Sequence, residues 1–173
     1  QRTPAEHISE IAFFETNDFM VLDSTTISNL DLLKSRTDAR EQSLLGVIDE
    51  TVTGMGSRLL RSWLLRPSIK RSEIETRLTA VEELGDVILR DKLRFLIKNV
   101  ADLERLTGRL NLGQTTPRDL IALKNSLDQT PQIVDALVDA NSLLLQVLAE
   151  NIFALPETRE LITKAIVDEP SSV

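Results

Sequence analysis

The sequence predicts a mostly α-helical, multihelical fold with at most a minor two-stranded β element near the N-terminus. Three observations support this fold class. Apolar residues recur at three- and four-residue spacing from Gly54 onward. Residues that start and stop helices, such as Thr53 and Pro67, flank these patterns. Only 3% of the residues are aromatic, so leucine and isoleucine must supply most of the packing.

The N-terminal part contains two short apolar runs, Phe19–Leu22 and Leu44–Ile48. Both have the length of a strand, and a pair of such strands is marginally stable unless a helix covers it. Between them, Asp23 or Ser24 can accept the first amide protons of a short helix that runs to Leu33. We therefore predict at most two short strands, on either side of one short helix.

An amphipathic helix follows Thr53, whose hydroxyl can cap it. Pro67 ends this helix, because the residue before a proline is pushed out of the α region. The apolar side chains on one face are Met55, Leu59, Leu60, Trp63 and Leu64. We expect Trp63, the only tryptophan, to be buried against the helices that come later in the chain.

The chain after Pro67 is a series of helical patterns. Ser72 and Glu75 form a predicted capping box, and Gly85 follows the last apolar position. The apolar face of this helix comprises Ile74, Leu78, Val81 and Leu84. A longer heptad-like seam, which needs a partner helix, comprises Leu89, Leu93, Leu96, Val100 and Leu103, with Leu106 and Leu110 as an extension.

The C-terminal part contains further helices with dense apolar faces. Thr116 caps a helix whose first residue is Pro117, and Thr130-Pro131 predicts that a new helix starts there. Leu143–Phe153 and Glu157–Val167 supply two more helical patterns. We expect these apolar faces to need a partner surface, because exposed contiguous apolar patches drive association.

The residue inventory argues against an enzyme. His7 is the only histidine and cysteine is absent, so neither a nucleophile–histidine pair nor a zinc cluster is predicted. Gly54-Met55-Gly56 lacks the spacing of a phosphate-binding loop and predicts a turn. Glu82 and Glu83 are expected to be solvated charges. The predicted set of catalytic, cofactor-binding and metal-ligating residues is therefore empty.

Charge bears on the choice between DNA contact and scaffolding. The formal net charge is −7, which argues against a surface that is broadly attracted to phosphate. One basic cluster occurs in sequence, at Arg58, Arg61, Arg66, Lys70, Arg71 and Arg77. We interpret it as a solvated face offset by nearby glutamates, and a phosphate-contacting face stays open as an alternative. No run of about 18 apolar residues is present to span a membrane.

Several strings of the sequence resemble the core domain of the MutS DNA mismatch repair family. They are Phe19–Thr26 with Asn29–Leu32, Ser43–Thr51, Thr53–Leu64, Asp102–Leu106 and Pro117–Leu120, in the family's order. The resemblance implies a helical core, or lever, domain over residues 19–173 and the tail of a preceding connector domain over residues 1–18. It also implies that the chain is a piece of a longer protein, without the clamp, the returning lever segment or the ATPase.

The resemblance implies a function for the longer protein. There the core domain mechanically links an ATP-hydrolysing domain to a DNA-clamping domain and is itself not an enzyme. Implied partners are the connector, clamp and ATPase domains, mismatched duplex DNA reached through the longer protein, and a second copy in a homodimer. Implied cofactors are ATP and Mg²⁺, both held outside this chain, in a cytoplasmic protein.

Two other functions stay open from the sequence alone. One is a helical scaffold or partner-binding module without a repair role, and the other is a duplex-DNA contact through the Arg58–Arg77 stretch. Phe13 and Glu15 match the spacing of the family's mismatch-reading motif. Because that motif belongs to a separate N-terminal domain, we interpret this match as coincidence.

Overall fold

The computed structural model describes residues 18–35 and 42–167. Helices dominate these ranges, which confirms the predicted fold class. In chain order the helices are α1 (Ser24–Asn29), α2 (Leu44–Ile48), α3 (Gly54–Leu65), α4 (Arg71–Glu83), α5 (Val87–Lys98), α6 (Leu103–Asn111), α7 (Pro117–Ala136), α8 (Leu143–Glu150) and α9 (Pro156–Ala165).

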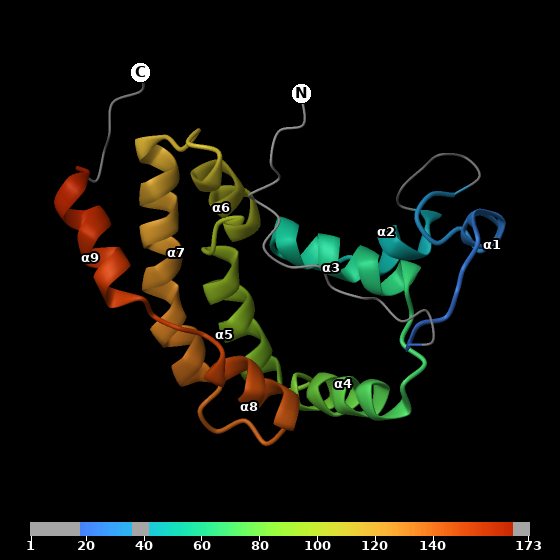
Figure 1. Cartoon of the computed structure of the whole chain (residues 1–173). Coiled ribbons are helices and arrows are strands. Elements are labelled where there is room, and N and C mark those ends of the chain that lie inside the picture. The colour runs from blue at the N-terminus through green and yellow to red at the C-terminus, as the bar shows by residue number, and fades with distance from the viewer. Residues whose placement is uncertain (1–17, 36–41, 168–173) are drawn as a thin grey trace, which may run out of the picture.

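Figure 1 shows these helices in three parts. The arm comprises α1, α2 and α3, the base comprises α4 and α8, and the pillar comprises α5, α6, α7 and α9. In the pillar, α7 packs against both α5 and α9, and in the base α4 packs against α8. The N-terminal end of α3 is directed toward the pillar, while its C-terminal end leads down to α4 (Figure 1).

The hydrophobic core lies where the base meets the pillar. Its buried residues are Ala80, Leu93, Leu96, Ile133, Leu137, Ala140 and Leu145. Leu93 and Leu96 belong to α5, which packs along α7, so the predicted leucine seam has a partner helix. Burying a leucine or isoleucine side chain contributes roughly 1.5–3 kcal/mol. The base and the pillar are therefore held together by buried apolar surface.

Several helix ends lie where the sequence predicts them. The Asp23 carboxylate accepts from the Thr26 amide at 2.6 Å, and the Thr53 hydroxyl accepts from the Gly56 amide at 3.1 Å. Helix α3 ends at Leu65, as expected before a proline. Thr116 and Asp119 form a reciprocal capping box at the start of α7. The Thr26 amide also lowers the pKa of the Asp23 carboxyl below its usual range.

The two predicted strands are not found among the described residues. Leu44–Ile48 is helix α2, and the Ser43 hydroxyl caps it by accepting from the Gly46 amide at 3.1 Å. A five-residue apolar run fits either a strand or a buried helix. In the structure the run is helical, and the Ser43 side chain caps it. Phe19 instead forms an isolated antiparallel bridge with Ser68, in the linker between α3 and α4.

The predicted capping box at Ser72 and Glu75 is wrong. Helix α4 begins at Arg71, and its N-cap residue Lys70 has no side-chain cap. The linker before α4 pairs with the N-terminal segment, since the Met20 amide donates to the Pro67 carbonyl at 2.8 Å. The helix begins where this extended pairing ends, which places Ser72 inside the first turn.

Two helix boundaries in the second half also differ from the prediction. Helix α7 runs through Pro131 without restarting. Pro131 has no amide proton for the Leu127 carbonyl, and the Thr130 hydroxyl donates to that carbonyl instead, at 2.8 Å. The leucine seam after Leu89 is divided, because α5 ends at Lys98 and α6 begins after a new cap at Asp102.

Trp63 is 41% exposed, so its predicted burial is wrong. The Arg77 guanidinium lies over its ring, 3.9 Å from the centroid. Most of the predicted inner face of α4 is also exposed, with Leu78 at 61% and Val81 at 66%. Ala80 and, of the predicted face, Leu84 pack into the core instead. Helical spacing identifies an apolar face, but it does not show whether this chain covers that face.

Candidate functional site

The basic stretch from Arg58 to Arg77 is largely neutralised within the chain. Lys70 pairs with Asp18 at 2.6 Å, Arg71 with Glu75 at 2.7 Å, and Arg77 with Glu73. Arg58 also has acidic partners, described next. An arginine that is already paired has less charge to offer a phosphate. This geometry favours the interpretation as an offset face over a DNA-contacting one.

The most extensive ion-pair cluster of this stretch joins the arm to the pillar. Arg58 on α3 donates from Nη1 and Nη2 to the two carboxylate oxygens of Asp102, each at 2.8 Å. Its Nε donates to Glu104 Oε2 at 2.9 Å. Because a planar guanidinium matches a carboxylate in this two-bond geometry, the contact fixes orientation as well as distance.

Local sequence explains why these groups meet. Arg58 lies one turn into α3, and Asp102 is the N-cap of α6, where it also accepts from the Arg105 amide at 3.3 Å. Glu104 lies in the first turn of α6, where a carboxylate is favoured. Gly54 leaves room for the contact, since a Cβ there would lie 3.2 Å from Asp102 Oδ2.

The electrostatics of the cluster follow from these contacts. Hydrogen bonds from Arg58 are the main cause that lowers the pKa of the Asp102 carboxyl to about 2. The same contacts raise the pKa of Arg58 above its ordinary value. Arg105 adds a cation 3.4 Å from Asp102. Asp102 is therefore ionised at every physiological pH and is unsuited to act as a general acid.

A second polar contact joins arm and pillar close to the first. The loop before α3 is held by Asp49, whose carboxylate accepts from the Thr51 hydroxyl at 2.6 Å and the Ser57 hydroxyl at 2.7 Å. Arg94 of α5 donates to the Glu50 carbonyl in this loop at 2.7 Å. Charged side chains of the pillar thus reach both the loop and the helix that follows it.

Glu83 differs from the solvated charge that the sequence predicts. Its carboxylate accepts from the backbone amides of Asn141 and Ser142, each at 2.7 Å. These bonds lower the pKa of the Glu83 carboxyl. Ser142 is the N-cap of α8 but forms no side-chain cap there. A residue of α4 therefore caps α8, a role that no local pattern reveals.

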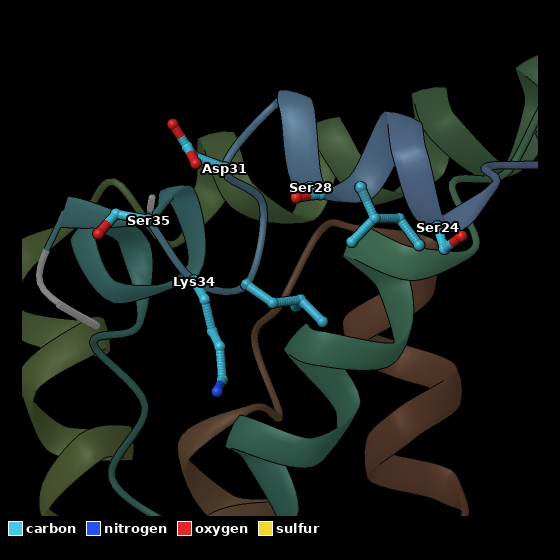
Figure 2. A pocket seen from close by; sticks show the side chains of 7 residues that line it. Ser24, Ser28, Asp31, Lys34 and Ser35 are labelled. Carbon is cyan, nitrogen blue, oxygen red and sulfur yellow. The ribbon is translucent and has the colours of Figure 1, made fainter. Parts of the chain in front are cut away.

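One surface pocket of about 470 Å³ lies beside α1. Its lining residues include Ser24, Ser28, Asp31 and Lys34. Figure 2 shows that the Asp31 and Lys34 side chains point in opposite directions and do not converge on one point. The pocket therefore lacks the convergent polar groups that orient a substrate.

The remaining candidates are metal-ligating and catalytic groups. Within residues 18–35 and 42–167, no three His, Cys, Asp or Glu side chains lie together as a metal site. His7, Phe13 and Glu15 lie outside the described residues, so their predicted roles stay predictions. No helix in the described ranges is both long and apolar enough to cross a bilayer.

Most of this chain matches a known protein family. The family model for MutS domain III matches residues 25–173. The chain belongs to the MutS domain III family. This finding confirms the resemblance seen in the sequence, and it covers the arm, the base and the pillar of the described structure.

The relatives that this MutS domain III matches are consistent with the family. The DNA mismatch repair protein MutS of Pelotomaculum thermopropionicum is 45% identical, over 98% of this chain and 20% of its own length. Its counterpart in Caldanaerobacter subterraneus is 43% identical, over 99% of this chain and 20% of its own length. That of Symbiobacterium thermophilum is 46% identical over 95% of this chain. The chain thus spans a fifth of the length of the first two relatives.

Proposed function

We propose that this MutS domain III is a non-catalytic lever in a longer DNA mismatch repair protein, between an ATPase domain and a DNA-clamping domain. The supporting observation is the pillar, in which α7 packs against α5 and shares with it a core that also includes the base. A helix with continuous backbone bonds transmits displacement along its axis, and α7 has twenty residues. One backbone bond is missing at Pro131, and the Thr130 hydroxyl donates to the Leu127 carbonyl in its place, so that α7 runs on through the proline.

Exposed apolar side chains support contact with further segments. Leu143 on α8, Phe153 in the following loop and Leu161 on α9 are all exposed. Exposed apolar surface of this kind marks contact sites. The partners we propose are the connector, clamp and ATPase domains, mismatched duplex DNA reached through the longer protein, and a second copy in a homodimer. We assign this protein to the cytoplasm.

We propose that the ATP and Mg²⁺ of the longer protein are held outside this chain. The first turn of α3, which holds Gly54-Met55-Gly56, faces the Asp102 carboxylate. The Arg58 guanidinium beside this turn is already bonded to Asp102 and Glu104, so it has less charge to offer a phosphate group. We therefore expect the isolated chain neither to bind nor to hydrolyse ATP, and we place the nucleotide site in another domain.

The lever is tested in a full-length MutS protein that carries this domain. Asn125 is exposed in the interior of α7, where a proline breaks the helix at a cost of about 3 kcal/mol. We expect Asn125→Pro to abolish the stimulation of ATP hydrolysis by mismatched duplex, while hydrolysis without DNA persists. Asn125→Ala, the matched control, should keep both. Undiminished stimulation, with α7 shown by hydrogen exchange to be interrupted, would contradict the lever.

The direct DNA contact is the second candidate function, and the paired arginines count against it. We expect the isolated chain to bind mismatched and matched duplex equally weakly. Titrations at several salt concentrations test this, because phosphate contacts give a steep salt dependence. Tight, steeply salt-dependent binding that weakens in Arg61→Gln would favour the DNA-contacting function instead.

A further inference from the structure

Charged side chains attach the arm to the pillar, whereas a buried apolar core joins the base to the pillar. Helix α3 has no fully buried residue, and its extensive helix–helix contact is with α2, inside the arm. The side-chain contacts that carry it to the pillar are Arg58 with Asp102 and Glu104, and Arg94 with the Glu50 carbonyl. The arm thus meets the pillar through charged groups.

We propose that Arg58, Asp102 and Glu104 form an ionic latch, whose opening lets the arm swing away from the pillar as a unit. This inference does not depend on the lever function, because it concerns only contacts within the chain. The latch is partly open to water, with 39% of the Arg58 side chain and 23% of the Asp102 side chain exposed. Water and salt therefore have access to the pair, which makes opening reversible.

A hinge for this motion lies in the linker from Arg66 to Lys70. Arg66 leaves the helical conformation, with φ −134° and ψ 68°, and Pro67 prevents α3 from continuing into α4. Helix α4 starts without a side-chain cap. Helix α4 makes its extensive helix–helix contact with α8, and it makes no such contact with α3. A rotation here would break the stacking of Arg77 (α4) on Trp63 (α3) but leave the core between the base and the pillar intact.

Gly54 shows that the latch depends on a close fit. A Cβ at this position would crowd Asp102 Oδ2, at 3.2 Å, and would touch Arg58 Nη1, at 3.5 Å. A larger residue at position 54 can therefore separate Arg58 from Asp102 without removing any charge. This gives a steric route to the open state beside the electrostatic one.

The experiment measures the distance from arm to pillar in the whole chain. The sequence has no cysteine, so nitroxide labels can be placed only at Ser28→Cys on α1 and Arg118→Cys on α7, both exposed. Electron–electron resonance then gives the distance distribution. We expect a narrow distribution at low salt that broadens to longer distances in Arg58→Gln, in Asp102→Asn and at about 1 M salt, where charges are screened within 3 Å.

Matched variants separate the latch from a general loss of fold. Arg61→Gln removes the same charge from the same helix and should leave the distribution narrow. Asp102→Asn keeps a good N-cap for α6, so helix content by circular dichroism should be unchanged. The double variant Arg58→Gln/Asp102→Asn should broaden the distribution no more than either single variant. Gly54→Val should open the arm with all charges present.

Two results would overturn the latch. One is an Arg58→Gln distribution as narrow as that of the parent chain, with unchanged helix content. The other is equal broadening by Arg61→Gln, which would show that net charge and not this cluster holds the arm.

Discussion

The pillar and the arm are both helical, but different forces attach each of them to the rest of the chain. Leu93, Leu96 and Ile133 join the pillar to the base through buried apolar surface. The arm is joined to the pillar through Arg58 and Arg94. Apolar burial is insensitive to moderate salt, whereas partly exposed ion pairs weaken with it. The same chain therefore contains one rigid junction and one adjustable junction.

The difference also shows how a domain can be both stiff and responsive. A close-packed interior resists small displacements, because each shift opens a void or creates a clash. A charged contact in partial solvent can be made and broken at little cost. We therefore expect substitutions in the two junctions to differ in size and in their dependence on solution conditions.

The largest effect is expected from the apolar junction. Leu96→Ala should lower the free energy of unfolding by roughly 2–5 kcal/mol, because Leu96 is 4% exposed and its removal leaves a cavity. Leu148→Ala on the exposed face of α8 is the matched control and should stay within about 0.5 kcal/mol. Urea melts measure both, and equal losses would show that the core does not lie where the structure places it.

Trp63→Ala should have a smaller effect than its size suggests. Since the ring is half-exposed, mainly its stacking with Arg77 is lost, and we expect a loss of about 1 kcal/mol. The tryptophan fluorescence of the parent chain should also be quenched readily by an aqueous quencher. A loss as large as that of Leu96→Ala, together with shielded fluorescence, would restore the burial that the sequence predicts.

Removing one helix cap in the arm tests whether the arm unfolds separately from the pillar. Thr53→Ala should cost about 1 kcal/mol, because the Gly56 amide loses its acceptor, while Thr53→Ser should restore most of it. Hydrogen exchange should localise the loss to α3 in the arm and leave α7 protected. Spread of the loss into α7 would mean that arm and pillar unfold as one unit.

The smallest effect on the attachment of the arm is expected from lowering the pH. The pKa of Asp102 is held at about 2, below its ordinary 3.8, so its contribution to the arm's attachment is complete above about pH 4. It is lost as pH falls through about 2. A carboxyl resonance of Asp102 that titrates near 2 in the parent chain and near 3.8 in Arg58→Gln would confirm this. Titration near 3.8 in both chains would contradict it.

Local features of the fold are predictable from the sequence. Thr53, Pro67 and Thr116 set helix ends through groups within a few residues, so their effects are visible in a short window. The seam with Leu93 and Leu96 is likewise periodic. Leu44–Ile48 fails because it is too short for its period to be decisive, and Ser43 is a weak signal alone.

Long-range features are not predictable in this way. Arg58 and Asp102 lie 44 residues apart, and nothing in either neighbourhood specifies the other. Glu83 resembles a surface charge until the fold brings α8 to it. Exposure of Trp63 depends on which helices the fold packs beside α3, which periodicity cannot show. The family is nevertheless recognisable, because strings in a fixed order carry more information than any single contact.

The reach of Glu83 to the start of α8 has a consequence for how the chain folds. The first amides of an isolated helix of eight residues are unsatisfied, and so short a helix is unstable alone. Here their acceptor arrives from α4, 59 residues earlier in the chain. We therefore expect α8 to form only after α4 has taken its place beside it. During synthesis, the base would then close only after the residues of α8 have left the ribosome.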